Sequence, residues 1–178
     1  LKTINGKKYA FDDEGKMLYG WVAADNAERV DDTDGDAFKE GDYYFGGEDD
    51  GAMTTGWLLM DITYDEATSD YEIAPAFNED EDQSRWFYFK SNGKKVYSGS
   101  TDETKNKTIN GKKYTFDQYG AMVAEWSLDK AKASDNVGTS SFAGYEKKAE
   151  SAKYSQSWRY FSSVEDGARV SKGWFKVV

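Results

Sequence analysis

The sequence has no cysteine and no histidine, and a single proline among its 178 residues. The absence of cysteine and histidine excludes Ser-His-Asp and Cys-His nucleophilic catalysis, thiolate chemistry and zinc sites built from His or Cys. The chain also lacks a long apolar run, so no membrane span is predicted. The absence of cysteine fits a reducing cytosol as well as a secreted protein without disulfides.

Aliphatic residues are scarce. Leu, Ile, Val and Phe together number 28 of 178, and the formal net charge is −10. The share of these four residue types is below the ~20% that marks disordered chains when net charge is high. Trp, Tyr and Phe, however, number 29, and disordered chains are poor in aromatic residues. We therefore expect an ordered protein whose core is built from rings.

Charge is divided unevenly along the chain. Residues 1–89 carry a net charge of −16 and residues 90–178 a net charge of +6. An acidic first half argues against nucleic acid as the main partner. The chain begins with Leu1 and shows no signal peptide, which we interpret as a processed piece of a longer protein.

The sequence repeats itself. Thr3–Trp21 and Thr108–Trp126 are identical at 12 of 19 aligned positions, at an offset of 105 residues. Asp42–Trp57 and Trp158–Trp174 form a looser pair, and Trp86–Gly99 is a fifth, degenerate copy. Such self-similarity is typical of a repeat architecture.

Each copy contains an aromatic cluster that ends in Phe, a turn that ends in Gly, and a short segment that usually closes on Trp. The anchor phenylalanines of repeats 1 to 5 are Phe11, Phe45, Phe89, Phe116 and Phe161. The turn glycines are Gly15, Gly51, Gly93, Gly120 and Gly167. The closing tryptophans are Trp21, Trp57, Trp126 and Trp174, with Ser100 in the third copy.

Each copy is predicted to form a β-hairpin, because aromatic and β-branched residues favour strands and, in repeats 1 and 4, rings alternate with Ala10 and Thr115. Asn5-Gly6, Asn92-Gly93 and Asn110-Gly111 are strong hairpin-turn signals. Since a lone hairpin is marginal in water, we expect the hairpins to stack into one array. The predicted fold is mostly β: a β-hairpin solenoid spanning 1–178. Its repeats lie at about 3–22, 41–58, 84–100, 108–127 and 156–175.

Long polar linkers separate the repeats, at Val22–Glu40, Leu58–Ser84 and Ser127–Ser157. In the last of these, helical spacing of apolar residues predicts one short helix over 142–153. In the second linker, the segments that begin at Ile62 and Tyr71 are candidates for an additional strand pair.

The acidic run Asp31–Asp36 has two interpretations. Alternating aspartates around Gly35 suggest a calcium loop, but the Gly and Glu positions of the EF-hand pattern are not met. A solvated acidic loop is therefore favoured. Paired acids elsewhere recur at turn positions, which favours turn chemistry over glycosidase catalysis, and we expect no enzyme and no cofactor.

The stretches YYFGGEDDGAMTTGW and TINGKKYAFDDEGKMLYGW resemble the cell-wall-binding repeats of Gram-positive surface proteins. That family includes the choline-binding repeats and the related glucan-binding and clostridial toxin repeats. The resemblance covers the five hairpins, about half of the chain. It implies a β-hairpin solenoid that anchors a secreted protein to wall polysaccharide or teichoic acid without catalysis, at an extracellular, wall-associated location.

In choline-binding members of this family, rings from successive repeats enclose the choline head group through cation–π attraction. The resemblance places these rings at the closing Trp and at the position three residues before the next anchor. That position holds Lys8, Asp42, Trp86, Lys113 and Trp158 in repeats 1 to 5. Only Trp57 with Trp86 and Trp126 with Trp158 pair two rings, so choline is the weaker ligand candidate and a neutral glycan is favoured.

The candidate ligand-binding residues are the aromatic side chains at or beside these positions. They are Trp21, Tyr43, Trp57, Trp86, Tyr88, Trp126, Trp158, Tyr160 and Trp174. The alternative for each Trp is packing between hairpins. The alternative for the whole chain is a structural spacer or protein-docking module without glycan binding, which the missing Trp at Ser100 and missing Gly at Glu125 favour.

Overall fold

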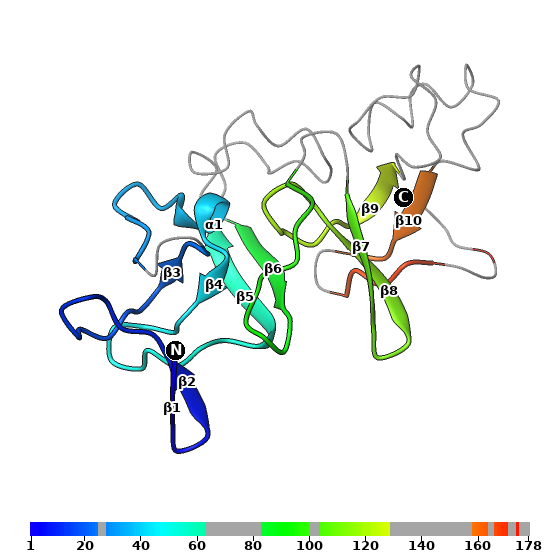
Figure 1. Cartoon of the computed structure of the whole chain (residues 1–178). Coiled ribbons are helices and arrows are strands. Elements are labelled where there is room, and N and C mark those ends of the chain that lie inside the picture. Colours follow the sequence, from blue (N-terminus) through cyan, green and yellow to red (C-terminus); the bar gives the residue numbers. More distant parts are fainter. Residues whose placement is uncertain are drawn as a thin grey trace.

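The computed structural model describes residues 1–24, 28–62, 83–99, 104–128, 158–163, 166–170 and 174, with the backbone alone at 83, 125–128 and 158. Within these residues, ten strands form five antiparallel two-stranded sheets, which follow one another from the N-terminal to the C-terminal end (Figure 1). The elements are β1 (Lys2–Ile4), β2 (Lys7–Tyr9), β3 (Trp21–Val22), α1 (Ala37–Glu40), β4 (Tyr43–Tyr44), β5 (Gly56–Ile62), β6 (Gln83–Phe89), β7 (Lys105–Ile109), β8 (Lys112–Phe116), β9 (Glu125–Leu128) and β10 (Trp158–Phe161).

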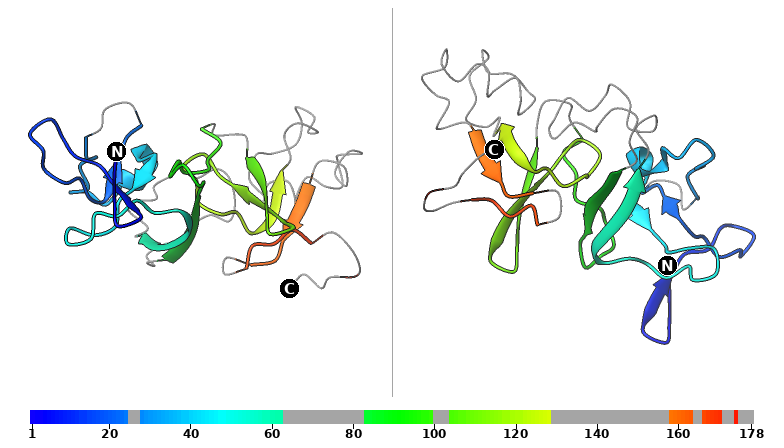
Figure 2. Two further views of the ribbon diagram at one scale, coloured as in Figure 1. Left: turned by 60° about the horizontal axis from the view of Figure 1, so that its bottom comes forward. Right: turned by 180° about the vertical axis from the view of Figure 1, so that it is seen from behind.

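Two hairpins form at the Asn-Gly turns. The β1–β2 pair closes at Asn5-Gly6, with φ of 50° and 81°, and the β7–β8 pair closes at Asn110-Gly111, with φ of 50° and 80°. Positive φ at both central residues is the type I′ geometry that Asn-Gly favours, because its twist matches that of the strands. Both hairpins project from the same side of the molecule (Figures 1 and 2).

The anchor phenylalanines close a tight turn in each repeat. In four repeats the anchor forms a β-bridge to the residue two positions after the turn glycine: Phe11 to Met17, Phe89 to Lys95, Phe116 to Met122 and Phe161 to Arg169. We call this second residue the bridge position; in repeat 2 it is Met53. In all five repeats the carbonyl before the anchor accepts a hydrogen bond from the residue after the bridge position, at 2.8–2.9 Å.

Part of the strand pairing lies between repeats rather than within them. The closing Trp of one repeat pairs with the Tyr before the next anchor: Trp21 with Tyr44, Trp57 with Tyr88 and Trp126 with Tyr160. In β5–β6 the pairing extends to Ile62 and Gln83. Residues 58–62 and 83–84 are therefore strand, although the sequence analysis assigned them to a polar linker.

The same backbone hydrogen bond recurs at four junctions between repeats. The bridge-position amide donates to the carbonyl three residues before the preceding anchor: Met53 to Lys8, Lys95 to Asp42, Met122 to Trp86 and Arg169 to Lys113, at 2.7–2.8 Å. The following turn glycine then packs against the bridge-position side chain, since a Cβ on Gly93 would lie 2.4 Å from Sδ of Met53. The mostly β class and its antiparallel hairpins are confirmed, whereas the solenoid arrangement stays a prediction.

The core consists largely of rings, as the composition predicts. Phe45, Phe87, Phe89 and Phe116 are at most 1% exposed, and Phe161 is 2% exposed. A fully buried Phe contributes roughly 1.5–3 kcal/mol relative to an exposed one. Aromatic burial at the anchors of repeats 2 to 5 therefore adds to a small aliphatic core, whereas the anchor of repeat 1, Phe11, is only half-buried.

One element was not predicted. Helix α1 is a single turn that buries Phe38 against the rings of Phe87 and Tyr119. The acidic loop before it uses its aspartates as local acceptors. Asp31 Oδ1 accepts from the Thr33 hydroxyl at 2.6 Å, which lowers the pKa of Asp31, and Asp32 Oδ1 accepts from the Ala37 amide at 3.2 Å.

The predicted helix over 142–153 and the predicted strand segment at Tyr71 lie outside the described residues. Ile62, the start of the other predicted segment, is described and pairs with Gln83 of β6. In the part of the chain that the structure describes, no three acidic side chains gather in a way that could hold a metal ion. Among the same residues, no helix is long and apolar enough to cross a membrane.

Candidate functional site

The Trp57 ring lies at the centre of an aromatic group formed by three successive repeats. Trp57 on β5 is paired with Tyr88 on β6, so both side chains share one face of the sheet. Their ring centroids are 5.1 Å apart at an interplanar angle of 70°. Trp86 is two residues from Tyr88 and therefore on the same face; its ring is 6.1 Å from that of Trp57, at 85°.

Repeat 4 completes the group. The Tyr114 ring on β8 is 4.9 Å from the Trp57 ring at 69°, and the Phe116 ring is 5.8 Å away at 36°. Because Phe116 is fully buried, it forms the floor beneath the other rings. We call these five residues (Trp57, Trp86, Tyr88, Tyr114 and Phe116) the Trp57 cage.

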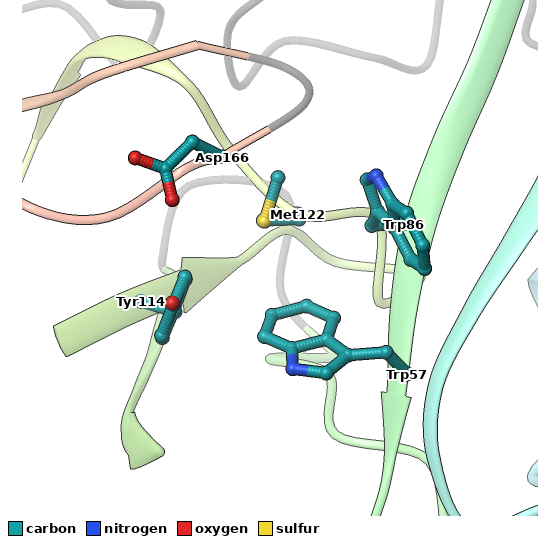
Figure 3. Close-up of a pocket in the computed structure, with 5 residues that line it drawn as sticks. All are labelled: Trp57, Trp86, Tyr114, Met122 and Asp166. Atoms are coloured by element: carbon teal, nitrogen blue, oxygen red, sulfur yellow. The ribbon is translucent and has the colours of Figure 1, made fainter. Parts of the chain in front are cut away.

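A hollow of about 200 Å³ opens beside the Trp57 cage. Its walls come from four repeats, and the lining residues are Trp57, Trp86, Tyr114, Met122 and Asp166 (Figure 3). The side chains of Trp57, Trp86, Tyr114 and Asp166 are arranged around Met122 in Figure 3. Asp166 is the one carboxylate among these lining residues.

Local hydrogen bonds hold Asp166 in place. The Ser162 hydroxyl donates to its Oδ2 at 3.2 Å, and its own amide donates to the Ser163 hydroxyl at 3.1 Å. Lys112 lies 4.0 Å from Oδ1, but both partners are more than half exposed, so this ion pair contributes little. The carboxylate therefore adds negative charge to the rim of an otherwise aromatic hollow.

This arrangement suits a small organic cation. Rings at steep angles to one another enclose a volume and direct several negative π-faces toward it, which attracts an ammonium group. A neutral sugar instead stacks flat against one broad exposed ring face. The carboxylate of Asp166 adds a second favourable term for a cation.

A second group of rings repeats this geometry one repeat earlier. The Trp21 ring is 5.2 Å from Tyr44 at 63°, 5.7 Å from Phe87 at 71° and 5.9 Å from Phe89 at 36°. These positions correspond to Tyr88, Tyr114 and Phe116 around Trp57. We call Trp21, Tyr44, Phe87 and Phe89 the Trp21 cage.

The Trp21 cage is occupied by a side chain of the protein. Lys95 is 3% exposed, and its Nζ lies 5.0 Å from the ring centroid of Trp21 and 5.9 Å from that of Phe87. The Nζ also donates a hydrogen bond of 2.5 Å to the Phe38 carbonyl. Burial lowers the pKa of Lys95 to about 7, while the nearby carboxylates of Asp42 and Asp117 act in the opposite direction.

The structure places the candidate residues from the sequence in different surroundings. Trp57, Trp86 and Tyr88 come together in the Trp57 cage. Trp21 is 2% exposed, so it lies in the core instead of lining an open groove, because Lys95 and three rings cover it. Tyr43 packs against Phe45, with ring centroids 6.2 Å apart.

The remaining candidates lie toward the C-terminal end. Tyr160 is half-buried on β10 and pairs with Trp126 on β9. The side chains of Trp126 and Trp158 are outside the described part of the chain. Trp174 is fully exposed.

Apart from the anchor phenylalanines, six residues that form the two cages, line the hollow or occupy a cage were not predicted as site residues: Tyr44, Phe87, Tyr114, Met122, Asp166 and Lys95. Tyr114 stands two residues before its anchor, a position that the repeat comparison did not test for cage rings. Met122 and Lys95 are both bridge-position residues, and aligning that position across repeats shows two cations, Lys95 and Arg169, among three methionines. Asp166 was noted only as a turn residue.

A second hollow, of about 190 Å³, is basic. It is lined by Asn106, Lys107, Thr108, Lys113, Arg159, Phe161 and Arg169. No carboxylate is among these residues, so the hollow favours an anionic oxygen ligand over a cation. The Lys107 Nζ also lies 5.8 Å from the ring of Tyr88, which places this basic region beside the Trp57 cage.

No family model matches the chain. No curated protein matches it in sequence. Among solved structures, it is similar to CbpJ from Streptococcus pneumoniae TIGR4, with a TM-score of 0.52 and 19% identity. The match covers 99% of this chain and 36% of CbpJ, so the chain spans about a third of that protein's length.

A second similar structure is choline binding protein F from Streptococcus pneumoniae, with a TM-score of 0.48 and 22% identity. That match covers 95% of this chain and 33% of the other. The likeness to CbpJ covers nearly the whole of this chain. The chain therefore shares the fold of that part of CbpJ.

Proposed function

We propose that this chain is a non-catalytic cell-wall-binding repeat module and that its Trp57 cage binds the quaternary ammonium head group of a wall polymer. The observation that carries the proposal is the hollow formed by Trp57, Trp86, Tyr114 and Asp166. Several ring faces and one carboxylate around a small volume are the features that recognise such a cation. In this proposal the protein acts outside the cell, at the bacterial envelope.

The geometry favours a cation over the neutral glycan that the sequence analysis preferred. That preference rested on the cage position, which holds a ring in only two repeats and a lysine, which would repel choline, in repeats 1 and 4. Lys8 and Lys113 are exposed, and neither lines the hollow of the Trp57 cage. The repulsion expected from a lysine therefore does not apply at this junction.

The basic hollow beside the cage supports a polymer that carries negative charge as well. Lys107, Lys113 and Arg169 could pair with the phosphate groups of a teichoic acid while an ammonium substituent occupies the Trp57 cage. A polymer with both charges would engage two neighbouring hollows of one array, which raises the effective affinity.

Binding of choline, measured by isothermal titration calorimetry, tests the proposed head group. The matched control ligand is 3,3-dimethylbutan-1-ol, which has the shape of choline without its charge. We expect choline to bind at least about 10-fold more tightly, which corresponds to ~1.4 kcal/mol of cation–π and carboxylate attraction. Equal affinities would contradict an ammonium site.

Variants locate the site. Trp86→Ala removes a half-buried wall of the hollow, so we expect choline affinity to fall about 10-fold or more. Trp174→Ala, at a fully exposed Trp, is the matched control and should leave the affinity unchanged. Asp166→Asn should weaken binding about 3-fold to 10-fold, since it removes a rim charge but keeps the shape.

Retention on purified bacterial walls, prepared with and without teichoic acid, separates the alternatives. The proposal expects retention that requires teichoic acid and that free choline competes away. Retention that choline does not affect would favour a glycan ligand. No retention on any wall preparation would instead favour the spacer or protein-docking module.

A further inference from the structure

The two cages are equivalent in position as well as in shape. The Trp57 cage takes its closing Trp from repeat 2 and its floor from repeat 4, and the Trp21 cage takes its closing Trp from repeat 1 and its floor from repeat 3. Centroid distances from the closing Trp to the paired Tyr agree within 0.1 Å, at 5.2 and 5.1 Å. Distances to the floor Phe also agree, at 5.9 and 5.8 Å, with the same angle of 36°.

Among the differences between the cages, two place a charged residue at the Trp21 cage. At the bridge position, Met122 lines the open hollow of the Trp57 cage, whereas Lys95 extends into the Trp21 cage. Three residues before the anchor, Trp86 forms a wall of one cage, and Asp42 holds the same place in the other. Relative to the Trp57 cage, the Trp21 cage therefore gains one cation, Lys95, and one anion, Asp42.

The environment of the Lys95 Nζ is that of a bound ammonium ligand. Rings of Trp21, Phe87 and Tyr97 lie 5.0, 5.9 and 5.3 Å from it. The Phe38 carbonyl accepts its hydrogen bond, and the carboxylates of Asp42 and Asp117 are close enough to affect its charge. Gly120 covers the aliphatic stem, since a Cβ there would lie 2.9 Å from Cδ of Lys95.

We propose that the Trp21 cage is a second ammonium-binding site whose resident ligand is the chain's own Lys95. The tethered Lys95 side chain excludes external cations and connects repeat 3 to the closing strand of repeat 1. Removing it leaves a cage of the same ring geometry that accepts a small quaternary ammonium ion. The inference shares the ring chemistry of the proposed function but concerns a different site.

The test uses Lys95→Met, because methionine occupies the bridge position of repeats 1, 2 and 4. Lys90→Met, at an exposed lysine five residues earlier in the same repeat, is the matched control. Tetramethylammonium is titrated into the wild type and both variants by calorimetry. We expect the Lys95 variant to bind one more ion per chain than the wild type, and the Lys90 variant to bind the same number.

The outcomes for the two sites are distinguishable. A wild type that binds no ion, with one ion gained in Lys95→Met, contradicts the proposed function and supports the Trp21 cage. Binding to the wild type without a gain in Lys95→Met contradicts the Trp21 cage alone. A gain in both variants also contradicts it, since the ion would then respond to lysine removal in general.

A measurement on the wild type covers the case in which Lys95→Met does not fold. Protons that face aromatic rings resonate upfield, and the ε-methylene of Lys95 lies among three of them. We expect one lysine ε-methylene signal to be shifted upfield by at least about 0.5 ppm at pH 6. An unshifted set of lysine signals from the folded protein would overturn the proposal.

Discussion

At the scale of single residues, Asp117 shows how a turn side chain acquires a second role. Its Oδ1 accepts hydrogen bonds from the amides of Tyr119, Gly120 and Ala121 at 2.9–3.0 Å. Asp12 holds the equivalent turn in repeat 1 with two such bonds, but on the surface. Asp117 is buried and acts on the charge of Lys95, so one carboxylate both closes the turn of repeat 4 and faces the internal cation.

The two buried charges predict a minimum in the pH dependence of stability. Burial raises the pKa of Asp117 to about 6, although its backbone hydrogen bonds act in the opposite direction. Because the folded state then holds this proton more tightly than the unfolded state, the free energy of unfolding falls as pH rises from about 4 to 6. Burial lowers the pKa of Lys95 to about 7, so stability is regained as pH rises from about 7 toward 10. We expect the free energy of unfolding to be lowest between about pH 6 and 7.

Urea unfolding at pH 4, 6.5 and 9 measures this dependence. The rise from pH 6.5 to 9 should be absent in Lys95→Met and present in Lys90→Met, because Lys90 is exposed. A rise of equal size in Lys95→Met would show that another group causes it.

At the scale of elements, Gly41 determines how closely α1 and β4 approach the Trp21 ring. Its φ of −70° is ordinary, yet a Cβ there would lie 2.5 Å from Cε3 of Trp21. The Trp21 ring cannot move aside, because it is 2% exposed and packed among other rings. Space rather than backbone conformation therefore requires glycine at this position.

Gly41→Ala should lower the free energy of unfolding by about 1–3 kcal/mol through overpacking. Gly47→Ala is the matched control, since a Cβ at Gly47 would meet nothing within 4 Å. We expect the control to change stability by no more than about 0.5 kcal/mol. Urea denaturation of both variants makes the comparison, and similar losses would show that the Trp21 ring is able to move.

The sequence predicts the elements whose causes are local. The anchors, the turn glycines and the Asn5-Gly6 and Asn110-Gly111 hairpins all depend on residues within a few positions of one another. Pairing of Trp57 with Tyr88 was missed because a long segment separates the two strands and nothing in the linker indicates their register. Helix α1 was missed because a single turn around Phe38 is stabilised by rings from other repeats.

The site was predictable only in part, for the same reason. Trp57, Trp86 and Tyr88 follow from the repeat alignment, whereas Tyr114 and Asp166 come from later repeats and need the fold to bring them close. The repeat alignment separates Lys95 from its neighbour Lys94, but it does not show that Lys95 is buried whereas Lys94 is not. The junction between repeats places one of the two in an aromatic cage.

At the scale of the whole molecule, a ligand in the Trp57 cage connects four repeats. Trp57, Trp86, Met122 and Asp166 belong to repeats 2, 3, 4 and 5. Binding to the folded state alone stabilises it and suppresses the local opening of the contacts that the ligand joins. A bound ligand should therefore suppress local opening more strongly in the C-terminal repeats than in the first repeat.

Amide hydrogen exchange with and without choline measures this difference. Exchange at Met122 and Arg169, which donate to Trp86 and Lys113, should slow when choline is bound. Exchange at Met53, which donates to Lys8, should change least, because Lys8 is not part of the cage. Slowing that is confined to Met53 would place the ligand at a different junction.

The bridge position has a consequence for how such arrays diversify. The methionine codon and one of the two lysine codons differ in a single base, so one nucleotide change can convert a methionine at this position to lysine. The ring scaffold and the junction hydrogen bond at that position are unaffected, because the bond uses the backbone amide. The number of open ligand sites can therefore evolve one junction at a time, and overall avidity with it, while the fold is conserved.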